Sequence, residues 1–137
     1  NLLSLWNGWN PEVPLLDKTG KIKHRFESKH MPLSLKKPEA FESTVETRYL
    51  EPDDRLFIYT DGITETKGEA KDSELFGGEG VEAVFKDSSD PNTYFDEILK
   101  RVSAYRGSGP QTDDVTMVEF INITPDECKP KVKKKKK

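Results

Sequence analysis

The sequence has a single cysteine, Cys128, among its 137 residues. One thiol excludes an internal disulfide framework and a cysteine zinc site. Cys128 lies beside a run of lysines and has no phosphate-binding loop around it, as a cysteine phosphatase would require. We therefore expect no chemistry based on a cysteine nucleophile.

The sequence also lacks long apolar runs. No segment reaches the roughly 18 apolar residues that a membrane-spanning helix needs, and no charged-then-apolar signal segment opens the chain. We expect a cytoplasmic location, whether or not the parent protein is attached to a sensor or membrane domain. The chain begins with Asn1 rather than Met, within a predicted strand over Leu2–Trp6, which suggests a longer parent.

Charge is distributed unevenly along the chain. Residues 125–137 hold seven lysines against Asp126 and Glu127, a charge of +5, whereas the whole chain carries −3, which leaves −8 on the body. An acidic body argues against specific binding of nucleic acid phosphates. We expect one domain over residues 1–124 and a disordered lysine-rich tail over residues 125–137.

The first half of the chain has the patterns of β-strands. The turn residues Asp17–Gly20 predict a hairpin between residues 13–16 and 22–26, with His24 on the same face as its apolar neighbours. Residues 41–50 alternate as a half-buried strand does, and we expect its charged side chains to face water.

The second half mixes strands and helices. Residues 55–60 are an apolar run, typical of a strand covered on both faces. The glycine-rich, charged residues 62–80 predict a mobile excursion. A short helix is expected over residues 80–85, and a longer one begins at Asp90 as N-cap. Residues 115–123 predict a closing strand.

The apolar residues of the longer helix and of the closing strand indicate structural roles. The longer helix has one apolar stripe from Phe95 to Tyr105, which indicates core rather than a cofactor site. In the closing strand we expect Val115, Met117 and Phe120 to point inward.

The histidines and tryptophans also favour structural roles. His24 and His30 have no acidic neighbour in sequence, which favours surface histidines over catalytic bases. Trp6 and Trp9 flank a turn, and packing is favoured over stacking on a ligand.

Two acidic sites lie at the ends of predicted strands. Asp61 follows the apolar strand, and Asp113 with Asp114 precedes the closing strand. Carboxylates fixed at the end of a sheet are ligands that Mg²⁺ and Mn²⁺ prefer, so these sites could meet at one metal. The alternative is structural, because Asp-Gly after a strand is a common turn and Asp-Asp before a strand is a common cap. Spacing alone favours the structural alternative.

The residues around these carboxylates carry a resemblance. Residues 50–66, Leu-Glu-Pro-Asp-Asp-Arg-Leu-Phe-Ile-Tyr-Thr-Asp-Gly-Ile-Thr-Glu-Thr, closely resemble a segment of bacterial metal-dependent protein phosphatases. These are the stage-II sporulation and sigma-regulator phosphatases, relatives of type-2C phosphatases. Residues 75–77, Leu-Phe-Gly, match the element that follows in that group. Residues 111–116, Gln-Thr-Asp-Asp-Val-Thr, match its Gln-x-Asp-Asp-hydrophobic-Thr motif.

The resemblance extends toward the start of the chain. Asn7, followed by prolines and then Leu15 and Leu16, is similar to the family's Asn-Ala-Gly-His-Pro segment. Residues 31–33, Met-Pro-Leu, resemble its Gly-hydrophobic-Pro-Leu turn. The likeness thus covers nearly the whole chain except the tail.

This resemblance implies both a fold and an activity. The implied fold is α/β (α+β), a type-2C-like α/β/β/α sandwich of two antiparallel sheets with helices outside, incomplete here on its N-terminal side. The implied activity is hydrolysis of phosphoserine and phosphothreonine in bacterial signalling by water activated at two Mn²⁺ or Mg²⁺ ions. The implied partner is a phosphorylated protein, such as an anti-sigma-factor antagonist.

The family's metal ligands can be carried over residue by residue. Asp61 matches the metal-binding aspartate of the Thr-Asp-Gly motif, and Asp113 matches the aspartate that heads the later acidic pair. Asp114 and Gly62 are expected beside the ion or as alternative ligands. The resemblance implies no catalytic residue beyond the metal ligands.

The sequence also departs from the family pattern. The first metal motif, an Asp-x-x-Gly-His-Gly-like segment, is absent, and Trp9 and Asn10 stand where the family has Gly-His. We therefore expect an incomplete metal site and little or no activity in this fragment. The alternative is a catalytically dead module that binds a sigma-factor-regulator partner. The sheet edge left by the missing half predicts self-association as a homodimer.

Overall fold

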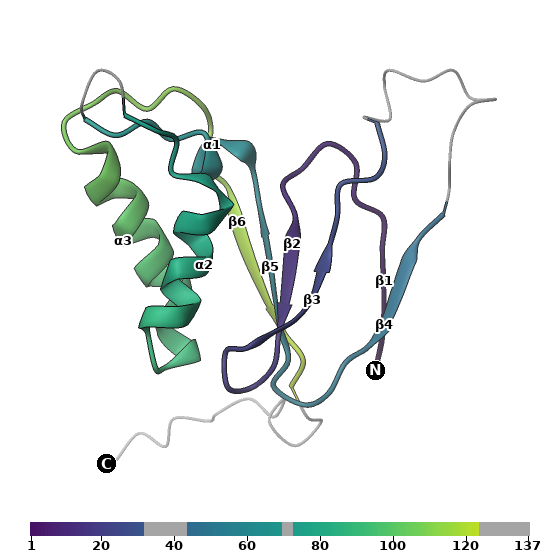
Figure 1. Cartoon of the computed structure of the whole chain (residues 1–137). Coiled ribbons are helices and arrows are strands. Elements are labelled where there is room, and N and C mark those ends of the chain that lie inside the picture. The colour runs from purple at the N-terminus through teal and green to yellow at the C-terminus, as the bar shows by residue number, and fades with distance from the viewer. Residues whose placement is uncertain (32–43, 70–72, 124–137) are drawn as a thin grey trace, which may run out of the picture.

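The computed structural model describes residues 1–31, 44–69 and 73–123, which form three layers (Figure 1). The middle layer is an antiparallel sheet with the strand order β3-β2-β5-β6, and the second sheet pairs β1 with β4. This arrangement confirms the predicted α+β fold of antiparallel sheets. The strands are β1 (Leu2–Leu5), β2 (Val13–Leu16), β3 (Ile22–Phe26), β4 (Glu46–Tyr49), β5 (Arg55–Tyr59) and β6 (Met117–Ile121).

The helices lie on one side of the four-stranded sheet (Figure 1). They are α1 (Asp61–Thr64), α2 (Gly77–Asp87), the 3₁₀ helix η2 (Pro91–Thr93) and α3 (Tyr94–Arg106). Asp90 is the N-cap of η2, which continues into α3, as predicted. Its carboxylate accepts a hydrogen bond from the N–H of Asn92 at 3.0 Å. Gly107, in the left-handed region at φ 57°, ends α3.

Two hydrophobic cores hold the layers together. The first lies between the four-stranded sheet and the helices, and the second between the two sheets. The first contains Leu16, Phe57, Tyr59, Ile63, Val81, Val84, Phe85, Tyr94, Ile98 and Val102. The second contains Val13, Leu15, Phe26, Leu50 and Leu56, with Leu3 and Leu5 of β1 packed against them. Because β5 contributes to both, the prediction that it is covered on both faces is confirmed.

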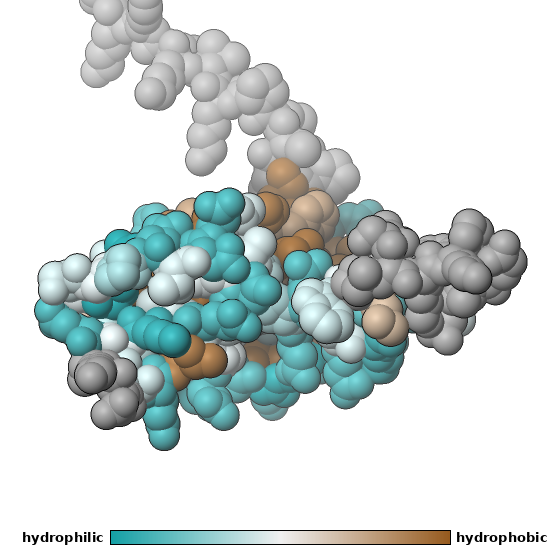
Figure 2. All heavy atoms as spheres, turned by 90° about the horizontal axis from the view of Figure 1, so that it is seen from above, coloured by the Kyte–Doolittle hydropathy of each residue, from teal (hydrophilic) through white to brown (hydrophobic). Residues whose placement is uncertain are grey.

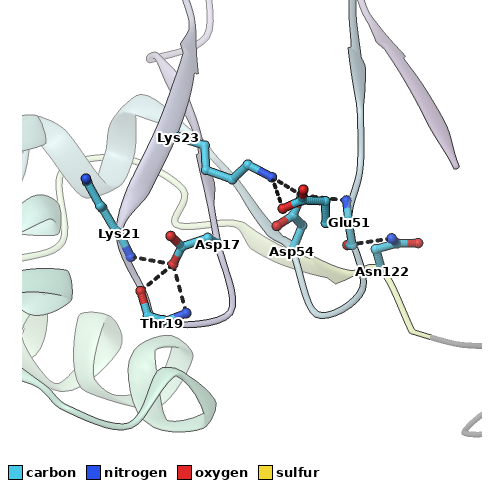
Figure 3. A network of polar contacts seen from close by, with 7 residues as sticks. All are labelled: Asp17, Thr19, Lys21, Lys23, Glu51, Asp54 and Asn122. Atoms are coloured by element: carbon cyan, nitrogen blue, oxygen red, sulfur yellow. Dashed lines mark hydrogen bonds and ion pairs between the residues drawn. The ribbon is translucent and has the colours of Figure 1, made fainter.

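The β2–β3 hairpin forms where the turn residues predicted it. The carboxylate of Asp17 accepts hydrogen bonds from the N–H and hydroxyl of Thr19 at 2.8 and 2.6 Å, and from the N–H of Lys21 at 3.1 Å (Figure 3). The Thr19 side chain is the main reason that the pKa of Asp17 is lowered. Gly20 supplies the positive φ, 87°, that closes the turn.

A second polar network joins three strands at the same end of the sheet (Figure 3). The buried carboxylate of Asp54 accepts hydrogen bonds from the Lys23 ammonium at 2.9 Å and from the N–H of Glu51 at 2.8 Å. Asn122, just after β6, donates its side-chain amide to the carbonyl of Glu51 at 2.7 Å. This network fixes the turn that leads into β5.

The structure corrects the predicted orientation of β4. Its alternation is present, but Tyr49 is 81% exposed while Glu46 and Arg48 are half-buried. The register places these two charged residues opposite Leu5 and Leu3, whose side chains face the other sheet. There Glu46 accepts a bond from Arg48 at 2.7 Å and pairs with His24 of β3 at 2.7 Å, so the charges turn inward.

Two further expectations are wrong, and a third is wrong in part. Phe120 of β6 is 49% exposed, because the strand's other face, with Met117, packs on the helix-side core. Residues 62–80 are not wholly irregular, because α1 and the start of α2 form their two ends, while the described residues 65–69 and 73–76 lie outside helices. Trp9 is 65% exposed and does not pack in the core.

The histidines have partners that the sequence did not reveal. His24 is half-buried against Glu46, and the ring of His30 stacks on Trp6 with centroids 5.0 Å apart. Both contacts join residues distant in sequence. Three predicted features lie partly or wholly outside the described residues. They are the turn over residues 31–33, of which only Met31 is described, residues 41–43 of the predicted strand, and the tail over residues 125–137.

Candidate functional site

The structure brings the two predicted acidic segments to one end of the sheet. In the antiparallel β5–β6 pair, Tyr59 at the end of β5 lies opposite Met117 at the start of β6. Asp61 begins α1 directly after β5, and Asp113 and Asp114 directly precede β6, so both segments lie at this end (Figure 1). Figure 2 views the molecule from above Figure 1, onto this end, where hydrophilic residues predominate.

Hydrogen bonds from the Thr60 side chain and a close backbone approach fix the two segments against each other. The hydroxyl of Thr60 donates to the carbonyl of Asp114 at 2.9 Å and accepts from the N–H of Thr116 at 3.0 Å. Gly62 is buried, and a Cβ added to it would lie 2.3 Å from the Asp114 carbonyl oxygen. The absence of a side chain at Gly62 therefore permits this close approach.

The carboxylates themselves remain accessible. Asp113 and Asp114 are exposed, and Asp61 is half-buried without a side-chain hydrogen bond to any described residue. Asp113 bonds only locally, accepting from the N–H of Asp114 at 2.7 Å, while the side chain of Gln111 donates to the Asp113 carbonyl at 2.9 Å. Carboxylate oxygens that protein donors leave available are suited to a hard cation.

The set of ligands is incomplete. Among residues 1–31, 44–69 and 73–123, no three His, Cys, Asp or Glu side chains are grouped so that they could hold a metal ion. The chemistry of Asp61 and Asp113 fits Mn²⁺ or Mg²⁺, but their number does not make a whole site.

A pocket of about 400 Å³ opens beside Asp61. It lies between the helix-facing side of the sheet and the start of α2, and Tyr59, Arg25 and Glu82 are among its lining residues. Burial, together with the nearby Glu82 and Glu12 carboxylates, raises the pKa of Tyr59 to about 12. Sequence analysis missed this pocket because its residues come from four separate segments.

Comparison with known families agrees with this geometry. The family model for stage II sporulation protein E matches residues 1–120, which is most of the chain. The chain belongs to the stage II sporulation protein E family. A search of curated proteins finds no match.

Solved structures share the fold of this SpoIIE-family chain. The SiaA-PP2C domain of Pseudomonas aeruginosa is 16% identical, with a TM-score of 0.63, over 81% of this chain and 43% of that one. The PP2C phosphatase domain of SpoIIE from Bacillus subtilis, solved with a fragment of its regulatory domain, is 20% identical, with a TM-score of 0.58, over 80% of this chain and 31% of that one.

A third match has two domains. The RsbU and RsbW domains of Rv1364c from Mycobacterium tuberculosis are 17% identical, with a TM-score of 0.57, over 86% of this chain and 31% of that one. This SpoIIE-family chain therefore spans less than half the length of these three solved chains. Among its described residues, no helix is long and apolar enough to cross a membrane.

Proposed function

We propose that this chain is the C-terminal part of a metal-dependent phosphoserine and phosphothreonine phosphatase domain. The observation that carries the proposal is the close approach of Gly62, next to Asp61, to the Asp113–Asp114 segment at one end of the sheet, within a chain of the SpoIIE family. Solved relatives named as PP2C phosphatase domains support the reaction class. One structure of the SpoIIE phosphatase domain was determined after presoaking with Mn, which supports the choice of metal.

In this proposal each residue of the site has a defined role. Asp61 and Asp113 hold Mn²⁺ or Mg²⁺, with Asp114 and Gly62 beside the ion or as alternative ligands. Thr60 and Gly62 position the Asp113–Asp114 segment through the Asp114 carbonyl. When bound, two such ions supply an activated water and neutralise charge on the phosphoryl oxygens.

The missing ligands belong to the rest of the domain. Because Asp61 and Asp113 are only two carboxylates, this chain alone binds metal weakly and hydrolyses little or no substrate. The proposed substrate is a phosphorylated regulatory protein of the cytoplasm, such as an anti-sigma-factor antagonist. We also propose that two copies of the chain associate through the sheet edge.

A second function is favoured by the incomplete ligand set. A catalytically dead phosphatase-like module would keep the fold and bind a sigma-factor-regulator partner without hydrolysing it. Among the described residues, no three His, Cys, Asp or Glu side chains form a metal site, and a binding module would need none.

Phosphatase assays separate the two functions. Release of phosphate from a phosphoserine peptide should require Mn²⁺ in the full-length protein and should be close to zero in the isolated 137-residue chain. Folded full-length protein that binds a partner but releases no phosphate with Mn²⁺ or Mg²⁺ would favour the dead module instead.

A further inference from the structure

The loop that leads from α3 to Asp113 is closed by a side chain at its own start. Arg106 is the last residue of α3, and its guanidinium donates from Nη1 to the side-chain oxygen of Gln111 at 3.0 Å. This contact joins the two ends of the loop over residues 107–110. Figure 1 shows that loop passing from the end of α3 toward β6, beside α1. Arg106 therefore connects the helix to the segment that carries the proposed metal ligand.

Packing holds the Arg106 side chain in this position. The residue is half-buried, and its Nε atom is buried. The N–H of Gly109 donates to the Arg106 carbonyl at 3.1 Å, and a Cβ added to Gly109 would lie 3.7 Å from Cγ of Arg106. The loop thus lies against the stem of the arginine. A stem that is already held loses little further conformational entropy when its guanidinium binds Gln111.

Gln111 relays this constraint to the backbone of Asp113. While its side-chain oxygen accepts from Arg106, its Nε2 donates to the main-chain carbonyl of Asp113 at 2.9 Å. The two bonds use the two different ends of one amide group. Arg106 therefore determines that the donor end, and not the acceptor end, faces the Asp113 carbonyl.

The main chain around Asp113 is held at two successive carbonyls. Gln111 binds the carbonyl of Asp113, and the hydroxyl of Thr60 donates to the carbonyl of Asp114 at 2.9 Å. The Asp113 carboxylate accepts from the N–H of Asp114 at 2.7 Å, so its direction depends on how these peptide groups are oriented. A ligand carboxylate needs such support, because the residues behind the ligands keep them in the geometry that the ion requires.

We propose that Arg106 is a positioning residue of the metal site, acting through Gln111 on the backbone of Asp113. The inference rests on the proposed function, because Asp113 is the ligand that is positioned. It predicts a change of affinity opposite to that expected from charge. Removing a positive charge near a cation site should strengthen Mn²⁺ binding by electrostatics alone, whereas loss of the positioning contact should weaken it.

Mn²⁺ affinity of the full-length protein, measured by electron paramagnetic resonance, tests this role. Arg106→Met keeps the stem and removes the donors, and Gln111→Ala removes the amide. Each should weaken Mn²⁺ binding about fivefold, the effect of roughly one hydrogen bond. The double variant should be little weaker than either single one, because the two side chains act in series. Arg106→Lys keeps one donor group and should recover part of the loss.

Arg101→Met is the matched control on the same helix. It removes a guanidinium that donates to Asp87 at 2.7 Å, and it should leave Mn²⁺ affinity unchanged. Affinity measured on folded protein does not respond to a loss of stability alone, which urea unfolding of each variant records separately. Unchanged or tighter Mn²⁺ binding in Arg106→Met would overturn the inference, and so would an equal loss in Arg101→Met.

Asp113→Asn separates this inference from the proposed function. If Asp113→Asn weakens Mn²⁺ binding while Arg106→Met and Gln111→Ala do not, the positioning role is wrong and the metal site stands. Unchanged affinity in Asp113→Asn would overturn both. Weaker binding in all three variants, in a full-length protein that releases no phosphate from a phosphoserine peptide, would support the positioning role and overturn the phosphatase alone.

Discussion

Gly62 lies directly against the carbonyl of Asp114, so close that a Cβ on Gly62 would come within 2.3 Å of the oxygen. Main-chain atoms cannot move aside as a flexible side chain can. Gly62→Ala should therefore push the Asp113–Asp114 segment away from Asp61. Overpacking of this kind typically costs about 1–3 kcal/mol of stability. Urea unfolding measures this loss, and a weaker Mn²⁺ affinity should accompany it.

Gly78 provides the matched control for that substitution. It lies in the first turn of α2, and a Cβ there would meet no atom within 4 Å. Gly78→Ala should leave stability unchanged or raise it by up to about 1 kcal/mol, because alanine favours a helix over the unfolded chain. Equal stability in the two alanine variants would contradict the close approach at Gly62.

Asp54, which is buried, should matter more for stability than the half-buried Asp53 beside it. Asp54→Asn removes the ion pair with Lys23 and weakens the bond from the N–H of Glu51. We expect a loss of about 2 kcal/mol, below the 3–5 kcal/mol of fully buried pairs, because Lys23 remains partly exposed. Thermal unfolding checks this. Asp53→Asn is the control, since Asp53 has a positive φ of 65° that asparagine tolerates well.

The same ion pair predicts a pH dependence at the alkaline end. The hydrogen bond to Asp54 is the main reason that the pKa of Lys23 is raised in the folded chain above its ordinary value. The stabilisation is therefore complete below the unfolded pKa and is lost as pH rises through the folded one. Stability measured above about pH 10 should fall less steeply in Lys23→Met, which has no titrating group.

Tyr59→Phe should reveal a hydroxyl that contributes nothing to the fold. Because this hydroxyl has no hydrogen bond to a described residue, its removal should leave stability at neutral pH unchanged or slightly higher. Its pKa of about 12 also means that stability falls as pH rises from about 10 to 12, and the variant should lack that part of the fall. Urea unfolding at several pH values measures both effects.

Tyr105→Phe is the control for Tyr59→Phe. The hydroxyl of Tyr105 donates to the carbonyl of Glu74 at 2.7 Å, so its loss should cost about 1 kcal/mol. A stability loss in Tyr59→Phe as large as that in Tyr105→Phe would show that the Tyr59 hydroxyl has a structural partner.

The sequence predicted the strands that flank the candidate site better than the orientation of side chains. Asp61 and Asp113 are predicted as ligands because strands end beside them and because the flanking residues resemble a known motif. The inward face of β4 was missed because alternation shows two faces without saying which is buried. That choice depends on Leu3, Leu5 and His24, which come from other strands. The pocket was missed for the same reason, since nothing local relates Glu12 and Arg25 to Glu82.

The most direct test of the account is whether Asp61 and Asp113 hold the same ion. Mn²⁺ affinity of the full-length protein, measured by electron paramagnetic resonance, should fall about tenfold or more in Asp61→Asn and in Asp113→Asn. The double variant should be little worse than either single one, since ligands of one ion are not additive. Unchanged affinity in either single variant, or losses that add in full, would contradict a shared metal site at this end of the sheet.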